Sequence, residues 1–403
     1  MDIKPFKGLL PEGSIVEKVV SPPYDVVTRE EVRKLIAENK LSFLRITRSD
    51  AEFGNEVGEY EECVYKKARE MLVDFIDEKV LLPDSSPSFY LISQNKNGRV
   101  QNGIYCLVRC EDYERGLIKK HELTHFDKEE DRTRHIFETK ADTGPVFLFF
   151  RNNGDFKSLI GEFQKDYPDY SFEDSEGVNY KLWKISMEED ILSIRKYFEN
   201  IDSFYIADGH HRAASAVNVW NKNGRKENSY GYFMAVVFPS DEVTILSYNR
   251  VLLNMKISEK RFLEELSKNF DLVETKNAIP QRKGEIGIFI GNKSFLLHFR
   301  DKTDDILNGL DVSILQNEVF SKILGIEDPR NSKDIAFMGG KDSEKIIIKM
   351  VKEKKAIAVF FLYPVDINDL MKVSDMGRIM PPKSTWFEPK LKDGLVTYLL
   401  DEI

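Results

Sequence analysis

Residues 204–220, FYIADGHHRAASAVNVW, change from a strand pattern to a helix pattern within a few positions. A short apolar run ends at Asp208 and Gly209, and small residues follow Arg212. Glycine permits a tight turn, and small side chains let a helix pack closely on a sheet. Such a turn points the first N–H groups of the helix toward whatever lies above it, and a helix N-terminus favours an anion. The chain must therefore contain a strand–glycine–helix unit.

The side chains of this turn predict a phosphate site. Arg212 can bind phosphate oxygens bidentately, and His210 and His211 add hydrogen-bond donors. Asp208 does not suit a bare phosphate, so we expect it to hold Mg²⁺ against phosphates or to orient a histidine. The structural alternative is that Asp208 only caps the helix and the two histidines lie in a surface turn.

A second polar stretch covers residues 119–134, KKHELTHFDKEEDRTR. Its His121, Glu122 and His125 match the zinc-protease pattern H-E-x-x-H. The flanking residues are charged, whereas the helix of such an enzyme is buried. The alternative is a segment that brings an acid and a base to a polar substrate, with His121 and Glu122 as catalytic candidates.

The second half of this stretch adds further candidates. Glu129 or Asp131 could act as general base in place of Glu122, while Lys128 and Arg132 could stabilise developing negative charge. A solvated, charged helix held by ion pairs is an equally good interpretation of these residues.

Paired prolines mark two loops. Residues 21–25, SPPYD, favour a rigid structural turn. In residues 380–385, MPPKST, the side chains of Lys383, Ser384 and Thr385 form a compact set that favours contact with an anionic ligand.

Composition narrows the classes of protein. The 403 residues suggest two or three domains, and the net charge of −9 disfavours nucleic acid as a partner. No stretch approaches the roughly 18 apolar residues of a membrane span, so we expect no membrane partner. Cys63, Cys106 and Cys110 form neither a disulfide framework nor a zinc set, which fits buried thiols in a reducing compartment. We expect a cytoplasmic protein.

Strand and helix patterns alternate along the chain. Residues 28–39 and 56–78 predict helices. Residues 89–110 predict a hairpin around Asn-Lys-Asn-Gly, and residues 230–251 predict another around Pro-Ser-Asp-Glu. The predicted fold class is therefore mixed α/β (α+β).

These motifs together resemble a widespread bacterial and archaeal family catalogued as a domain of unknown function. The resemblance runs nearly end to end. It is carried by the strings KPFKGL, SPPYDVV, LSFLRITR, IKKHELT, KEEDR, FYIADGHHRAASA and MPPKSTWFEPKLKDGL. Members often have a histidine just before the position of Arg250, where this chain has Asn249, so the family implies no catalytic role there.

A more distant resemblance indicates which reaction the protein catalyses. The string FYIADGHHRAASA is similar to the nucleotide-phosphate motif of the ParB and sulfiredoxin superfamily, and in particular to ParB-like kinases of free serine. It implies a phosphate site made of residues 208–212, with Asp208 as the Mg²⁺ ligand and ATP or ADP as the donor. It also implies a glutamate base, for which Glu122 is our choice on chemical grounds alone.

The resulting hypothesis is a small-molecule kinase, with L-serine as the acceptor. A nucleotide-gated ParB-like regulatory module and a metal-dependent hydrolase are the alternatives. We expect a ParB-like phosphate-binding core in residues 146–255, between an N-terminal α/β lobe (1–145) that carries the charged catalytic segment and a C-terminal α/β lobe (256–403). The predicted site residues are His121, Glu122, Asp131 and Arg132 for catalysis, and Asp208, Gly209, His210, His211, Arg212, Lys383, Ser384 and Thr385 for the nucleotide.

Overall fold

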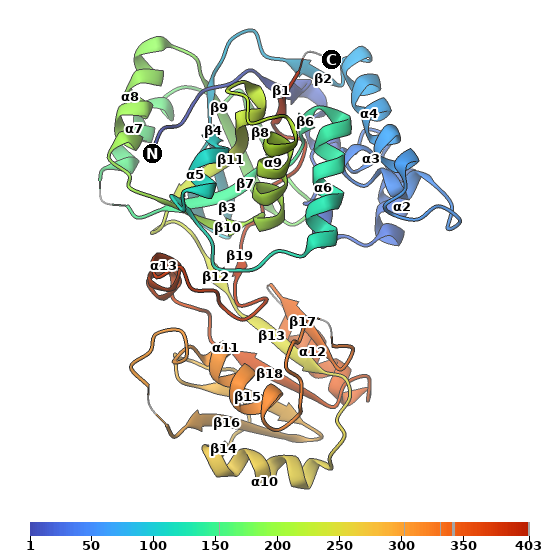
Figure 1. Cartoon of the computed structure of the whole chain (residues 1–403), viewed down its shortest axis with the longest axis vertical. Coiled ribbons are helices and arrows are strands. Elements are labelled where there is room, and N and C mark those ends of the chain that lie inside the picture. The colour runs from blue at the N-terminus through green and yellow to red at the C-terminus, as the bar shows by residue number, and fades with distance from the viewer. Residues whose placement is uncertain (153, 302, 331, 341–342, 402–403) are drawn as a thin grey trace. The chain divides into compact units, whose positions relative to one another are not determined.

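The computed structural model describes the chain except residues 153, 302, 331, 341–342 and 402–403, and it divides into two compact units (Figure 1). Unit 1 consists of Met1–Lys119, Thr124–Val243 and Pro389–Ile403, and unit 2 of Lys120–Leu123 and Thr244–Glu388. The chain thus enters unit 2 twice and returns to unit 1 at its end. This division differs from the three consecutive lobes expected from the sequence, because distant segments build each unit.

A mixed eight-stranded sheet forms the centre of unit 1. Its strands in spatial order are β5 (Ile118–Lys119), β10 (Phe204–Asp208), β7 (Val146–Phe150), β11 (Tyr232–Pro239), β4 (Arg99–Arg109), β3 (Phe89–Lys96), β9 (Val178–Ile185) and β8 (Tyr170–Glu173). The pairs β5–β10 and β7–β11 are parallel, and the other neighbours are antiparallel. The predicted mixed α/β class is confirmed.

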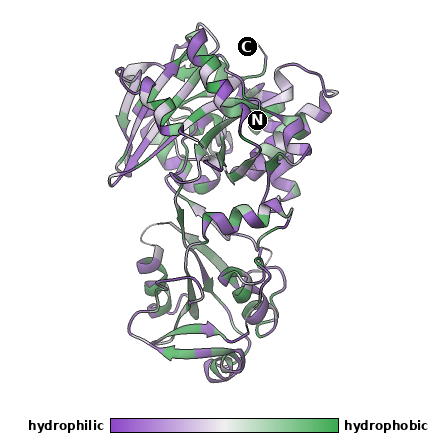
Figure 2. Cartoon of the chain, turned by 90° about the vertical axis from the view of Figure 1, so that its left-hand side faces the viewer, coloured by the Kyte–Doolittle hydropathy of each residue, from purple (hydrophilic) through white to green (hydrophobic). Residues whose placement is uncertain are grey.

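Helices pack on one face of this sheet. They are α5 (Cys110–Glu114), α7 (Phe156–Phe163), α8 (Glu188–Glu199) and α9 (His210–Lys222). Alternate residues of β7, Val146, Leu148 and Phe150, enter the same buried cluster as Phe156 of α7 and Trp220 of α9. Each such buried side chain contributes about 1.5–3 kcal/mol. In Figure 2 the strands of this unit carry both hydrophobic and hydrophilic stretches, as the apolar sequence of β7 and the alternating sequence of β9 require.

A second layer of unit 1 surrounds a small sheet with the order β2–β1–β20–β6. Its strands are β2 (Leu81–Pro83), β1 (Gly8–Pro11), β20 (Thr397–Leu399) and β6 (Ala141–Asp142), and its helices are α1 (Val16–Val19), α2 (Arg29–Glu38), α3 (Leu44–Thr47), α4 (Glu62–Asp77) and α6 (Phe126–Thr139). Helix α6 packs against both α4 and α9 (Figure 1). Both helices predicted in this part of the chain are confirmed. The capping box of Thr28 and Glu31 begins α2.

The two predicted hairpins have different outcomes. Strands β3 and β4 form the first, with Asn97 and Gly98 at positive φ angles of 55° and 82°. The second prediction is wrong. Strand β11 pairs with β4 and β7 in unit 1, whereas β13 (Tyr248–Leu252) pairs with strands of unit 2. The chain passes between the units where a hairpin turn was expected.

The described strands of the main sheet in unit 2 are all antiparallel. Their order is β14 (Phe270–Glu274), β16 (Lys293–Phe299), β15 (Ile286–Ile290), β18 (Ala358–Leu362), β13 and β17 (Ile335–Gly339). Helix α12 (Ser343–Lys352) packs Ile347 and Val351 against Val359 and Phe361 of β18. The unit also contains α10 (Glu259–Asn269), α11 (Asp311–Ile314), α13 (Ile367–Asp375) and the ribbon of β12 (Ile245–Leu246) with β19 (Trp386–Phe387).

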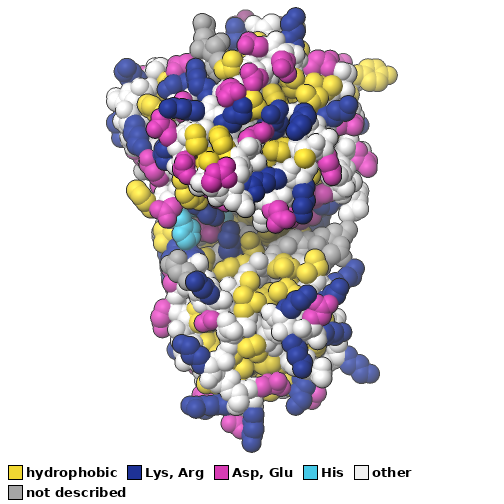
Figure 3. All heavy atoms as spheres, turned by 90° about the vertical axis from the view of Figure 1, so that its right-hand side faces the viewer, with side chains coloured by type: hydrophobic (Ala, Val, Ile, Leu, Met, Phe, Trp, Pro, Cys, Tyr) yellow, Lys and Arg dark blue, Asp and Glu magenta, His cyan; other side chains and the backbone are white. Residues whose placement is uncertain are grey.

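The surface and the thiols fit the expectations from composition. Acidic and basic side chains are interspersed on the face seen in Figure 3 rather than sorted by sign. Within the described residues, no helix combines the length and apolarity needed to cross a bilayer. All three cysteines are free thiols, and burial raises the pKa of Cys106 and Cys110.

Candidate functional site

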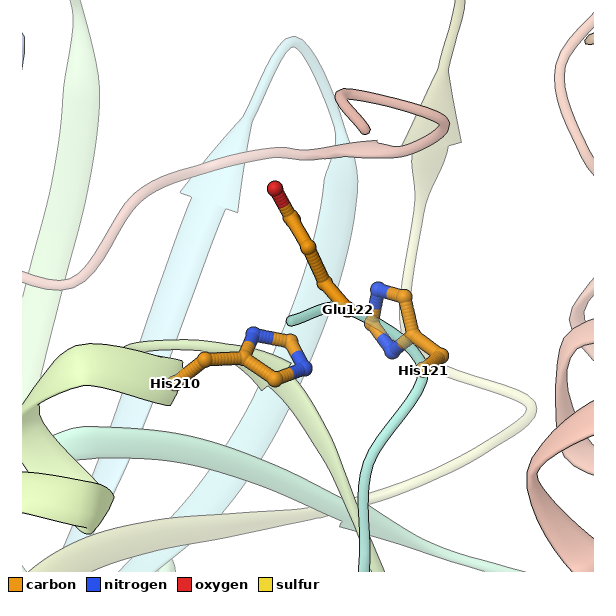
Figure 4. A group of neighbouring side chains, drawn as sticks. All are labelled: His121, Glu122 and His210. Carbon is orange, nitrogen blue, oxygen red and sulfur yellow. The ribbon is translucent and has the colours of Figure 1, made fainter. Parts of the chain in front are cut away.

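The turn between β10 and α9 has the predicted strand–glycine–helix geometry. Strand β10 ends at Asp208, Gly209 has a φ of 92°, and α9 begins at His210, which Figure 4 shows at the first turn of the helix. A Cβ atom at Gly209 would lie only 3.0 Å from the Arg212 Nε atom. A side chain there would therefore be strained by both its backbone conformation and its neighbour.

Two cations hold the Asp208 carboxylate at this turn. Its Oδ2 atom lies 3.2 Å from the Lys390 Nζ atom and 3.5 Å from an Arg212 terminal nitrogen. The other terminal nitrogen of Arg212 donates to the Pro145 carbonyl. Burial alone would raise the pKa of Asp208, but Lys390 and Arg212 outweigh it and keep that pKa well below its usual value.

An ionised carboxylate of this kind fits a magnesium ion. Mg²⁺ takes oxygen ligands and binds through one or two carboxylates together with phosphate oxygens. Asp208 supplies the carboxylate, and Lys390 and Arg212 supply positive charge for phosphate beside it. The donor set of the turn is thus compatible with a magnesium–phosphate ligand.

A buried aspartate, Asp393, joins two distant segments beside this turn. Its Oδ2 atom accepts a hydrogen bond from the Tyr24 backbone N–H at 3.1 Å, and its backbone pairs with Ser21 in both directions. Burial raises the pKa of Asp393 to about 7, and nearby Arg212 opposes this rise. The SPPYD loop, expected to be a structural turn, is therefore held against the residues that surround Arg212.

Asp131 and Arg132 lie on α6 in unit 1. Arg132 forms an ion pair with Asp131 at 2.8 Å and places its guanidinium 4.2 Å from the centre of the Tyr24 ring. Asp131 also accepts a hydrogen bond from the Tyr65 hydroxyl at 2.9 Å. Both predicted catalytic residues are thus engaged in contacts that position the Tyr24 loop.

His211 contacts the segment before α6. The His125 backbone N–H donates to the His211 Nε2 atom at 3.0 Å, and the two rings stack with centroids 6.1 Å apart. A ring nitrogen that accepts a hydrogen bond carries no proton, so this contact assigns His211 the neutral form protonated at Nδ1.

His121 and Glu122 belong to the short segment that enters unit 2 (Figure 4). The His121 Nε2 atom lies 3.2 Å from the Thr385 hydroxyl, and the His121 carbonyl accepts from the Met380 N–H at 2.9 Å. Residues 121–125 are not helical, because α6 begins only at Phe126. The zinc-protease interpretation is therefore wrong, since it needs both histidines on one helical face.

Arg250 holds the second proline loop, residues 380–385, through hydrogen bonds to its backbone. It donates to the carbonyls of Pro382 and Lys383 at 2.9 and 2.8 Å, and burial lowers its pKa to about 10. Ser384 is buried and donates to the Pro381 carbonyl, while the Lys383 side chain is exposed. Of the predicted ligand-binding set, Lys383 is thus the member that most clearly faces solvent.

The predicted site residues are divided between the two units. Unit 1 contains Asp131, Arg132 and the whole turn at residues 208–212, whereas unit 2 contains His121, Glu122 and residues 383–385. Sequence reasoning missed Lys390 and Asp393. Their signal in the sequence is the string KLKDG at residues 390–394, within the last motif that carries the family resemblance.

A comparison with protein families decides the relationship. The model of the family described as "Protein of unknown function (DUF1015)" matches residues 3–313. The chain belongs to this family. The matched span includes the turn at residues 208–212, the Tyr24 loop and α6, and it ends before Lys390 and Asp393. No curated protein matches the chain.

Several solved structures are similar to this chain. A free serine kinase variant in complex with ADP has 17% identity and a TM-score of 0.39, covering 70% of this chain and 87% of its own. A conserved hypothetical protein from Pyrococcus furiosus has 16% identity and the same TM-score, covering 73% and 95%. C-terminally truncated SbnI from Staphylococcus aureus has 12% identity and a TM-score of 0.39, covering 72% and 85%.

Proposed function

We propose that this protein is a small-molecule kinase that transfers a phosphoryl group from ATP or ADP to a hydroxyl group, with free L-serine as the acceptor. The observation that carries the proposal is the Asp208 carboxylate, held ionised by Lys390 and Arg212 at the N-terminus of α9.

The turn supplies the positive potential that nucleotide phosphates require. Lys390 and Arg212 pair with Asp208, and Asp25 and Asp393 also act on Arg212. The first N–H groups of the 13-residue helix α9 add the positive end of its dipole. Magnesium on Asp208 would neutralise phosphate oxygens during transfer. Arg212 is buried and fixed to Pro145, so it would stabilise the developing charge without reorganising.

Glu122 is our candidate for accepting the hydroxyl proton of the acceptor, with His121 beside it in sequence. Asp131 is less suitable, because Arg132 and Tyr65 already occupy its carboxylate. Lys383 is the member of the 383–385 set best placed to reach a ligand through solvent, because its side chain is exposed.

We propose L-serine as the acceptor and ATP or ADP as the donor because residues 204–216 resemble the phosphate motif of ParB-like kinases of free serine. A hydroxyl amino acid is small and needs no extended binding surface. The same chemistry would serve another small alcohol, so the test includes several acceptors.

The test is phosphoryl transfer followed by phosphorus NMR. The protein is incubated with Mg²⁺, ATP or ADP, and L-serine, L-threonine, glycerol or inositol. We expect a phosphoserine signal that Arg212→Ala reduces by about 100-fold or more. Arg212→Lys should also fail, because lysine keeps the charge but not the planar fork.

A matched control lies just beyond the C-terminal end of the same helix, which ends at Lys222. Arg225 pairs with Glu114 at 2.6 Å at the far end of α9 and is half exposed, so Arg225→Ala should transfer phosphate at the normal rate. Nucleotide binding without transfer to any acceptor would favour a nucleotide-gated module instead. Absence of nucleotide binding in the folded protein would refute the phosphate site.

A further inference from the structure

The two cations on Asp208 differ in how firmly they are held. The Arg212 side chain is only 7% exposed and is fixed to the Pro145 carbonyl. The Lys390 side chain is 19% exposed and ends in a single ammonium group on a flexible stem. The Lys390 carbonyl accepts a hydrogen bond from Gln94 at 3.2 Å, which holds the backbone at this position.

This arrangement conflicts with a metal ion at the same oxygen. The ammonium of Lys390 lies 3.2 Å from Asp208 Oδ2 and therefore competes with any cation that binds this oxygen. A divalent ion and an ammonium group at such a distance repel each other strongly where water is partly excluded. The lysine must therefore leave before the metal binds there, and phosphate oxygens are the natural partners for its charge.

We infer that Lys390 is a resident counterion that occupies the metal position on Asp208 and moves to a nucleotide phosphate when a magnesium nucleotide binds. This inference rests on the proposed function, because it takes Asp208 as the metal ligand. Its consequence is a coupling between the two ligands. Metal alone must compete with the lysine for this carboxylate, whereas metal with nucleotide also brings phosphate oxygens that attract the lysine's charge.

Coupling of this kind is reciprocal and can be measured without turnover. Mn²⁺ replaces Mg²⁺ as a paramagnetic probe, and its free concentration is followed by electron paramagnetic resonance with and without ADP. In the wild-type protein, ADP should tighten Mn²⁺ binding about tenfold or more. The variant Lys390→Met removes the charge but keeps the chain length.

The expected signature of this variant has two parts. Lys390→Met should bind Mn²⁺ alone about tenfold tighter than the wild type, because the competing charge is gone. It should also bind ADP more weakly, so the gain in Mn²⁺ affinity produced by ADP shrinks. Lys390→Gln is a second neutral variant with the same expected behaviour, and Lys390→Arg should behave like the wild type toward Mn²⁺ alone.

Two controls locate the effect. Lys222→Met removes a lysine at the other end of α9 that pairs with Glu130 at 3.2 Å, and it should leave both affinities unchanged. Asp208→Asn in the Lys390→Met background should abolish the tightened Mn²⁺ binding. Thermal unfolding of each variant confirms that it is folded before the binding is compared.

The outcomes separate this inference from the proposed function. If ADP and Mn²⁺ bind together but neutral variants of Lys390 bind Mn²⁺ alone no tighter than the wild type, the counterion role is refuted and the phosphate site stands. Mn²⁺ binding that survives Asp208→Asn would also refute it. If the wild type binds neither Mn²⁺ nor ADP, both proposals are refuted.

Discussion

The carboxylate of Asp393 accepts the backbone N–H of Tyr24 at 3.1 Å, although 369 positions separate the two residues in the chain. The same two segments pair through their backbones at Ser21. Asp393 is fully buried, and the positive charge of Arg212 favours the ionised form of its carboxyl group. A residue of the last segment therefore fixes a loop of the first one beside the candidate phosphate site.

The raised pKa of Asp393, about 7, predicts a loss of stability as pH rises. Its carboxyl group keeps its proton in the folded protein over a range where the unfolded chain, with a pKa near 3.9, has lost it. The stabilisation that the folded protein gains by holding this proton is thus fully present below about pH 4. It is lost as pH rises through about 7. Asp393→Asn stays neutral and should stabilise the protein relative to the wild type at pH 8 by about 2–4 kcal/mol.

Urea unfolding at pH 5 and pH 8 measures this effect. Asp142 is a second buried carboxylate with a pKa raised to about 7, and it is present in both proteins, so the difference between them isolates Asp393. An equal effect of Asp393→Asn at both pH values would show that the carboxyl group is not protonated in the folded state.

Gly209→Ala should destabilise the folded protein and weaken nucleotide binding. Its φ of 92° and the approach of Arg212 Nε predict a destabilisation of about 1–2 kcal/mol, together with weaker ADP binding. Gly161→Ala is the matched control, since Gly161 lies within α7 with no atom within 4 Å of the added Cβ. It should stabilise the protein by up to about 1 kcal/mol. Thermal unfolding that shows the same sign for both would contradict the argument.

Arg132 and Tyr24 should be energetically coupled. A largely buried guanidinium over an aromatic ring predicts a coupling of about 2 kcal/mol in a double-mutant cycle of Arg132→Met and Tyr24→Leu. The more exposed pair of Arg225 with Trp220, 4.3 Å from charge to ring, should give about 0.5–1 kcal/mol. Zero coupling in the first cycle would mean that Arg132 stabilises the protein through partners other than Tyr24, such as Asp131 and the Thr47 carbonyl.

Arg250→Ala should release the second proline loop. It removes the donors to Pro382 and Lys383 and leaves their carbonyls without this partner, at a local cost of about 2 kcal/mol. Amide exchange at residues 383–385 should therefore become about thirtyfold faster. Arg300→Ala, which breaks an exposed pair with Asp271, should leave this exchange unchanged. Unchanged exchange in Arg250→Ala would show that the loop is held by other contacts.

Local features of the fold could be predicted from the sequence. The turn from β10 into α9 was predicted because an apolar run, a glycine and small residues specify it within a few positions. The hairpin of β3 and β4 was predicted because Asn97 and Gly98 have the positive φ that its turn requires. In each case the signal lies in neighbouring residues, and the partners are close in sequence.

Features that depend on distant segments could not be predicted. An alternating pattern shows that β11 and β13 are strands but does not identify their partners, so the false hairpin was expected between them. Lys390 and Asp393 have no local chemistry that distinguishes them from ordinary surface charges. They reach the site only because the chain returns to unit 1 after building unit 2.

That return has a consequence for synthesis on the ribosome. Strand β20 lies between β1 and β6, and residues 390–393 complete the surroundings of Asp208 and Tyr24. Strand β20 and residues 390–393 are translated after residues 244–388, which form nearly all of unit 2. A nascent chain can therefore fold its second unit before its first is finished, and a product that stops before Pro389 would carry the turn at Asp208 without Lys390.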